Sequence, residues 1–120
     1  MRDLKDSIGM QQDDVVLVLT SAPDLELAHN IAQLVVQEGL AACVNIAPAV
    51  LSIYKWKEQI ESAGEIPLTI KTTWVRYAAL CTRIKALHPY DVPEIIVMPV
   101  MAGDNAYIQW VKDMTMDRTA

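Results

Sequence analysis

The sequence predicts an α+β fold, a ferredoxin-like βαββαβ sandwich with a long bent β-hairpin and a C-terminal helix. Short runs rich in β-branched residues alternate with stretches of helical periodicity. In the middle of the chain a long extended region folds back on itself with no helix between its halves. Two interleaved right-handed β-α-β crossovers in this order give a four-stranded antiparallel sheet with helices on one face.

Size and composition favour a single domain. The chain has 120 residues, of which 52% are hydrophobic and 21% charged. That composition is typical of a globular protein, and the length leaves too little chain for a second core. We expect a mobile tail over residues 1–12, because this stretch is polar and patternless. One ferredoxin-like domain is expected over residues 13–116, with a short tail over residues 117–120.

The first strand is expected at residues 15–19, a run of valines and leucines that predicts a central strand buried on both faces. A helix should follow it. Ser21 suits the N-cap, and Asp24 suits the reciprocal capping position. Helical spacing of apolar residues continues to Val35, and Gly39 ends the helix because it can adopt the left-handed conformation.

The middle of the chain predicts a hairpin longer than the layer that covers it. Residues 41–56 and 60–72 have the pattern of extended chain, and a short polar segment joins them. The first half would span about 50 Å at roughly 3.3 Å per residue, whereas the first helix spans only about 25 Å. Pro48 and Pro67 face each other across the hairpin. Since each lacks a ladder donor, we expect a bend or bulge there.

The overhanging part of the hairpin predicts an oligomer. It carries Ile53, Tyr54, Trp56 and Ile60, which would leave apolar surface and open strand edges in water. Burial against another chain is the usual remedy. We therefore expect the protein to associate with itself.

The remaining elements follow from the same patterns. Apolar residues at helical spacing predict a second helix from Trp74 to about His88, where Pro89 disfavours helical geometry in the residue before it. A strand at residues 94–98 and a third helix that begins near Gly103 complete the order.

Several classes of protein are excluded by what the sequence lacks. The glycines stand alone, so the GxGxxG, GxxxxGK[ST] and GxSxG motifs are absent. No Lys/Arg run accompanies the net charge of −5, so no nucleic-acid partner is expected. No apolar run reaches the roughly 20 residues of a membrane helix, and the N-terminus lacks the apolar stretch of a secretory signal. We expect no membrane partner and a cytoplasmic location, in which Cys43 and Cys81 are interpreted as buried free thiols.

Five motifs stand in order along the chain. They are Leu40-Ala41-Ala42-Cys43-Val44-Asn45-Ile46, Ser52-x-Tyr54-x-Trp56, Lys71-Thr72, His88-Pro89-Tyr90-x-x-Pro93-Glu94-Ile95 and Tyr107-x-x-Trp110. In this order and spacing the chain resembles the CutA divalent-cation-tolerance family, from about Val15 to Val111. The resemblance implies a ferredoxin-like protomer in a tight homotrimer similar to the PII signalling proteins. It also implies a role in tolerance of divalent metals, notably copper.

Two residues depart from the pattern of that family. Glu58 stands where members often have Gly in the hairpin, so we expect a wider turn. Thr20 stands where some members end the first strand with Cys, a proposed copper ligand. A hydroxyl is a poor ligand for soft copper(I), so a copper site of that kind is weakened.

His88 and Glu65 are the candidate metal ligands. His88 lies at a helix end, where a side chain can be held in place without burial, and neutral imidazole binds Cu(II) and Zn(II). Glu65 lies in the second hairpin strand and could add a carboxylate. No HxH, CxxC or HExxH spacing occurs, so Cu(II) or another divalent cation would need ligands assembled by folding or trimerisation. The alternatives are that His88 complements the helix dipole and that Glu65 is solvated.

Lys71, Tyr54, Trp56 and Tyr107 form the candidate ligand cleft. The resemblance places Lys71 at a cleft between subunits, where it and the aromatic residues could hold a small anion. The alternative is a lysine that is solvated or paired with Glu94.

Two functions therefore stay open, a metal-binding tolerance protein and a PII-like signalling or scaffold trimer that binds a small anion. We expect Trp56, Tyr54 and Trp110 at the trimer interface, which is the commoner role of exposed aromatic residues. No organic cofactor is expected. An enzyme is not expected either, because the sequence offers no nucleophile beside a base and no close carboxylate pair.

Overall fold

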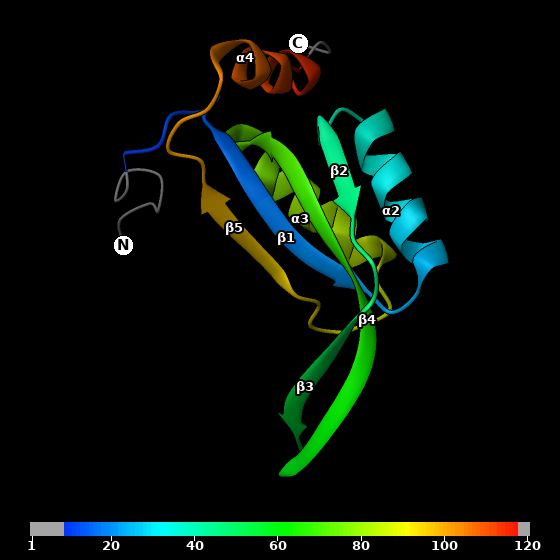
Figure 1. Ribbon diagram of the computed structural model, residues 1–120. Coiled ribbons are helices and arrows are strands. Elements are labelled where there is room, and N and C mark those ends of the chain that lie inside the picture. Colours follow the sequence, from blue (N-terminus) through cyan, green and yellow to red (C-terminus); the bar gives the residue numbers. More distant parts are fainter. Residues whose placement is uncertain (1–8, 118–120) are drawn as a thin grey trace.

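The computed structural model of the protein describes residues 9–117. Its antiparallel sheet has the strand order β2-β4-β1-β5, and β3 joins through its pairing with β4 (Figure 1). The elements in chain order are β1 (Val15–Ala22), α2 (Leu25–Gln37), β2 (Cys43–Ile46), β3 (Val50–Trp56), β4 (Gln59–Thr73), α3 (Trp74–Leu87), β5 (Ile95–Pro99) and α4 (Asn105–Met114). This confirms the predicted α+β sandwich with a C-terminal helix. The one difference in element order is that the first half of the hairpin is split into β2 and β3.

Strand β1 is the centre of the sheet, as its run of valines and leucines predicts. It pairs with β4 on one side and β5 on the other, and Val16 and Val18 have no exposed surface. The strand continues past residue 19 to Ala22, so the prediction that Ser21 caps the helix is wrong. Asp24 is the N-cap, and its Oδ1 accepts a hydrogen bond of 2.8 Å from the backbone N–H of Leu27.

The core lies between the sheet and the two helices α2 and α3. Leu80 and Ile84 of α3 are fully buried in it. The predicted burial of Cys43 and Cys81 is wrong, because each side chain is only partly buried. Cys43 alternates with the core-packed Val44 and so lies on the sheet face opposite the helices.

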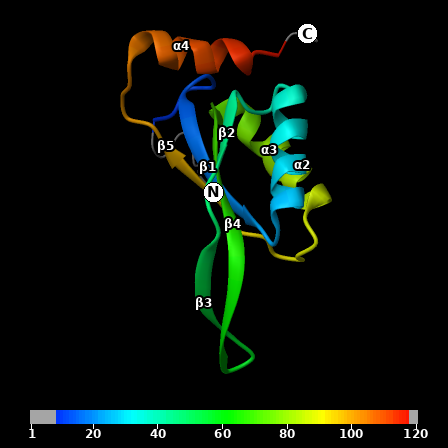
Figure 2. The same ribbon diagram turned by 45° about the vertical axis from the view of Figure 1, so that its right-hand side comes forward.

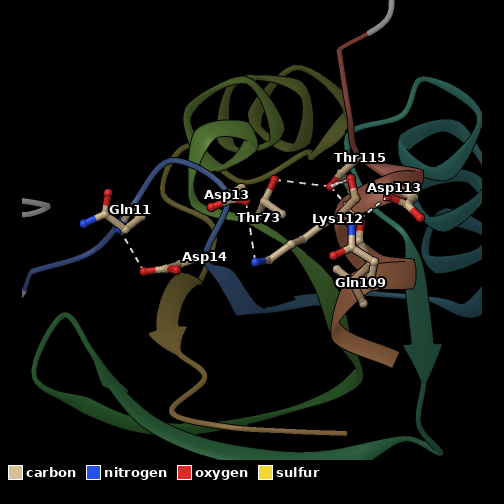
Figure 3. A network of polar contacts seen from close by, with 9 residues as sticks. Gln11, Asp13, Asp14, Thr73, Gln109, Lys112, Asp113 and Thr115 are labelled. Atoms are coloured by element: carbon tan, nitrogen blue, oxygen red, sulfur yellow. Dashed lines mark hydrogen bonds and ion pairs between the residues drawn. The ribbon is translucent and has the colours of Figure 1, made fainter. Parts of the chain in front are cut away.

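The domain begins earlier than residue 13. Met10 is buried in the core, and the carbonyl of Gln12 accepts a hydrogen bond of 2.8 Å from Val75. Asp13 then forms an ion pair of 3.5 Å with Lys112 of α4, within a network that joins the two ends of the domain (Figure 3). Residues 9–12 therefore belong to the packed domain and not to the expected tail. The rest of that tail lies outside the described residues, as do residues 118–120.

The hairpin projects from the sheet as an arm, built from β3 and the first half of β4 (Figures 1 and 2). Ile46 pairs with Leu68, whereas Val50 pairs with Glu65, so three residues on one strand oppose two on the other. This is the bulge predicted from the two opposed prolines. It redirects the arm away from the layer that the helices cover.

The turn at the tip of the arm is tight, and the expected wider turn is wrong. Trp56 pairs with Gln59, and the two residues between them, Lys57 and Glu58, have φ angles of 50° and 65°. A two-residue hairpin turn of this kind requires positive φ at both positions. Glu58 adopts a positive φ although it is not glycine, because a two-residue turn with positive φ at both positions matches the right-handed twist of the paired strands.

Much apolar surface stays exposed in a single chain. Leu51, Ile53 and Ile60 on the arm are 69%, 69% and 71% exposed. Both α2 and α3 pack on the same face of the sheet (Figures 1 and 2), and on the other face Ile96 and Met98 are exposed. Large exposed apolar side chains on an arm and on an uncovered sheet face are typical of interfaces with another chain.

Candidate functional site

A cavity of about 480 Å³ lies where the arm, the end of β1 and the segment after α3 meet. Its lining consists of Ser21, Tyr54, Trp56, Glu61, Glu65, Tyr90, Asp91, Val92 and Glu94. We call this cavity the arm pocket. It combines three aromatic rings with four carboxylates, and no lysine or arginine among the described residues lines it.

The arm presents one of its two faces to this pocket. Tyr54 pairs with Glu61, and Val50 pairs with Glu65. Side chains two residues apart on a strand share a face, and so do directly paired residues. Tyr54, Trp56, Glu61 and Glu65 therefore lie on the same side of the arm. The exposed isoleucines and leucine of the arm lie on the opposite side.

Glu65 is the carboxylate that the structure holds in place. Its Oε2 accepts hydrogen bonds of 3.2 Å from the hydroxyls of Ser21 and of Ser52. An ionised carboxylate can accept at both oxygens. Since both serines bind Oε2, Oε1 is the oxygen that a ligand in the pocket can use.

His88 is buried, at 8% exposure, and the prediction that it is held without burial is wrong. Its Nδ1 accepts a hydrogen bond of 3.2 Å from the backbone N–H of Tyr90, which requires Nδ1 to be unprotonated. Nε2 then carries the proton and donates it to the carbonyl of Ser21 at 2.8 Å. Both ring nitrogens are therefore in use, and this geometry leaves neither for a metal.

The predicted pair of His88 and Glu65 is joined through Ser21. The backbone carbonyl of Ser21 accepts from His88, and its hydroxyl donates to Glu65. His88 is thus a positioning residue for the carboxylate and for Tyr90, whose ring centroid lies 4.7 Å from the imidazole. Across residues 9–117, no group of three His, Cys, Asp or Glu side chains is arranged to hold a metal ion.

The structure does not bring the four residues of the predicted ligand cleft together in one chain. The ammonium of Lys71 lies 5.6 Å from the ring centroid of Tyr107 on α4. Tyr54 pairs with Glu61, which precedes Lys71 by ten positions along β4, or about 33 Å at 3.3 Å per residue. A cleft with all four residues would need two chains. The alternative in which Lys71 pairs with Glu94 does not occur in the described part of the chain.

Trp110 lies beside Tyr107 at the same end of the molecule. The two ring centroids are 5.6 Å apart, and the indole of Trp110 is 41% exposed. Trp110 is therefore remote from the arm residues Tyr54 and Trp56, with which it was predicted to form an interface.

Sequence reasoning missed several members of the arm pocket. Glu61 could have been found, because a turn centred on residues 57 and 58 already pairs it with Tyr54. Tyr90 and Glu94 belong to one of the five motifs, yet the sequence indicated neither of them as a residue of a metal or ligand site. Ser21 was missed because its position before Pro23 resembles a helix cap.

Two pKa shifts occur on α3, and neither group lines the arm pocket. Burial raises the pKa of the Tyr77 hydroxyl, and the neighbouring Cys81 adds to the effect. Glu38 raises the pKa of Arg83 by accepting two hydrogen bonds of 2.9 Å from its guanidinium. These bonds tie α2 to α3 at the surface.

Thr20 stands on the face of β1 that packs toward the helices. Its side chain is 2% exposed, and its Oγ1 has no hydrogen-bond partner among the described residues. A buried hydroxyl without a partner lowers stability by about 1–3 kcal/mol.

We expect Thr20→Val, which replaces that hydroxyl with a methyl group of similar volume, to raise the free energy of unfolding by about 1 kcal/mol in urea denaturation. Thr72→Val is the matched control. Thr72 is equally buried, but its hydroxyl donates a 2.7 Å hydrogen bond to the carbonyl of Leu40, so this variant should lose stability. A loss of stability in both variants would contradict the prediction.

None of the helices within residues 9–117 combines the length and the hydropathy needed to cross a membrane.

Comparison with known proteins matches nearly the whole described domain. A family model described as "CutA1 divalent ion tolerance protein" matches residues 16–114. The "Divalent-cation tolerance protein CutA" of Thermus thermophilus is 43% identical over 99 residues, which are 82% of this chain and 96% of that relative. The human "Protein CutA" is 39% identical over 107 residues, which are 89% of this chain but only 60% of that longer relative.

A solved structure of CutA from Xylella fastidiosa superposes with a TM-score of 0.84 at 43% sequence identity. The alignment covers 86% of this chain and 99% of that one. The fold with its arm is therefore shared with structures of this kind, and the ferredoxin-like prediction is confirmed.

Proposed function

The chain belongs to the CutA1 divalent ion tolerance family, and from this premise we propose that it binds divalent metal ions, copper among them, at the arm pocket of a homotrimer. Binding there would lower the concentration of the unbound ion, and no catalysed reaction is required. The observation that supports the proposal most directly is the negative charge of the pocket. Glu61, Glu65, Asp91 and Glu94 line it, and within residues 9–117 no lysine or arginine lies among the lining residues.

The donor set fits divalent cations as a class. Carboxylate and water oxygens suit hard ions such as Mn²⁺, and for a given set of N and O donors Cu²⁺ binds more tightly than its first-row neighbours. Glu65 is the ligand that we assign first, because two serines orient it. Since residues 9–117 of one chain do not bring three ligands together, water or a second chain would complete the shell.

The proposed homotrimer is supported by the apolar surface that a single chain leaves exposed. The arm and the sheet face opposite the helices both carry large apolar side chains in contact with solvent. An arm that projects beyond its own core can reach across a neighbouring copy. The unpaired edges of β3 and β2 would gain partners in the same contact.

The proposed location is the cytoplasm. Cys43 and Cys81 are both free thiols, and a reducing compartment keeps thiols in that state.

The test is calorimetry of the trimer with Cu(II) and with Mn(II), accompanied by native mass spectrometry to count chains and ions. Glu65→Gln should weaken metal binding by roughly tenfold or more, because it removes the oriented charge. Glu26→Gln is the matched control, since Glu26 is an exposed carboxylate on α2 that does not line the arm pocket. Equal affinity of wild type and Glu65→Gln for both metals would refute the site.

A small anion remains the second candidate ligand, and the observation in its favour is Lys71. Its ammonium contacts the ring of Tyr107 and forms no ion pair within residues 9–117. In a trimer that cation could meet the arm of another chain and form the intersubunit cleft of a PII-like signalling or scaffold protein. Anion binding at Lys71 should weaken steeply as ionic strength rises, whereas inner-sphere metal binding should respond less.

A further inference from the structure

We infer that the arm pocket also binds an organic cation, a flexible aliphatic amine with two or more positive charges, in competition with the divalent ion. The inference uses the pocket of the proposed function but does not depend on metal binding. It rests on three features that metal binding by carboxylates leaves unexplained. These are the aromatic lining, the separation of the carboxylates and the contact of the Lys57 ammonium with the ring of Trp56.

The aromatic lining is the first feature. Tyr54, Trp56 and Tyr90 line the cavity while 42%, 58% and 42% of their surface is exposed. A hydrated metal ion gains little from such rings. An ammonium group gains directly, because the face of an aromatic ring is negative and attracts a cation within about 6 Å of its centroid.

The separation of the carboxylates is the second feature. Four acidic side chains border one cavity of about 480 Å³, yet no three of the metal-ligating side chains in the described part of the chain are arranged for a single ion. A small ion can satisfy only carboxylates that meet at one point. A flexible chain with several ammonium groups can reach separate carboxylates at once, and its methylene groups can lie against Val92, which is 89% exposed.

The third feature is an ammonium group of the chain itself that already lies over one of these rings. The Nζ of Lys57 is 5.8 Å from the ring centroid of Trp56. Since lysine and an aliphatic amine carry the same group on the same kind of stem, the contact shows that the ring accepts this chemistry. An anionic ligand is disfavoured here, because it would have to approach four carboxylates with no lining cation.

The experiment titrates the assembled protein with spermidine, a triamine, and follows binding by calorimetry. We expect saturable binding that Mn(II) displaces. The uncharged 1,8-octanediol is the matched ligand control, since it keeps a methylene chain but lacks the charges, and it should not bind. Spermidine binding that equals that of the diol would overturn the inference, and so would spermidine binding that Mn(II) leaves unchanged although Mn(II) itself binds.

Two variants at one position separate an aromatic contact from general attraction to an acidic protein. Tyr90→Leu removes the aromatic face and should weaken spermidine binding roughly 3- to 30-fold, whereas Tyr90→Phe keeps the face and should bind nearly as wild type. Equal losses in Phe and Leu, or no loss in Leu, would overturn the cation–π assignment.

If spermidine binds and no metal does, the proposed function fails while this inference stands. If metals bind and spermidine does not, this inference fails while the proposed function stands.

Discussion

Replacing Trp56 with alanine is expected to weaken assembly of the protein by about 2–4 kcal/mol while the protomer keeps its fold. Trp56 is the last residue of β3, at the tip of the arm, and is 58% exposed in a single chain. It belongs to no buried cluster of the core. Its truncation should therefore remove contact between chains and very little contact within one.

Sedimentation at micromolar concentration and melting at several concentrations measure this effect. The wild type should sediment at about three times the mass of one chain, and the variant should dissociate on dilution and melt in a concentration-dependent way. Met101→Ala is the matched control, since Met101 is apolar and 99% exposed but lies off the arm. An unchanged mass and melting profile in Trp56→Ala would show that the arm tip does not hold the oligomer together.

Replacing His88 with alanine is expected to lower the free energy of unfolding by about 2–3 kcal/mol. The change leaves the buried carbonyl of Ser21 and the part-buried N–H of Tyr90 without their partner, and a buried unsatisfied group costs about 1–3 kcal/mol. Because Ser21 also holds Glu65, metal binding at the arm pocket should weaken together with stability.

Urea denaturation with paired metal titration tests this role of His88. The chain has only one other histidine, the exposed His29 on α2, and His29→Ala should change neither quantity. His88→Gln, whose amide can donate to the carbonyl of Ser21, should recover part of the stability. A His88→Ala variant with wild-type stability but no copper binding would instead make His88 a metal ligand and refute the positioning role.

Much of the fold could be read from the sequence because its signals are local. The apolar run of β1, the left-handed Gly39 with its φ of 72° and the end of α3 before Pro89 each depend on a few neighbouring residues. The bulge followed from two prolines placed opposite each other. These features require no knowledge of distant contacts, and the structure confirms them.

The expectations that failed depend on contacts between distant parts of the chain. Met10 is apolar within a polar segment, and only the packed core shows that it is buried. The tight turn at Glu58 is imposed by the pairing of β3 with β4, which overrides the preference for glycine. The sequence shows that His88 follows the end of a helix, which suggests an accessible side chain. It does not show that His88 forms a hydrogen bond with Ser21, which lies 67 positions earlier.

By itself the sequence determined the order of the elements, the central place of β1, the overlong arm and the family to which the chain belongs. Each of these follows from periodicity, turn chemistry or motif spacing. The tertiary structure alone decided what the site is made of. It placed Glu65 beside Ser21, turned both nitrogens of His88 inward and separated Lys71, near the end of β4, from Trp56, at the end of β3. The reason is physical: a strand or helix is specified by neighbours in sequence, whereas a pocket is specified by which side chains of separate elements face the same space.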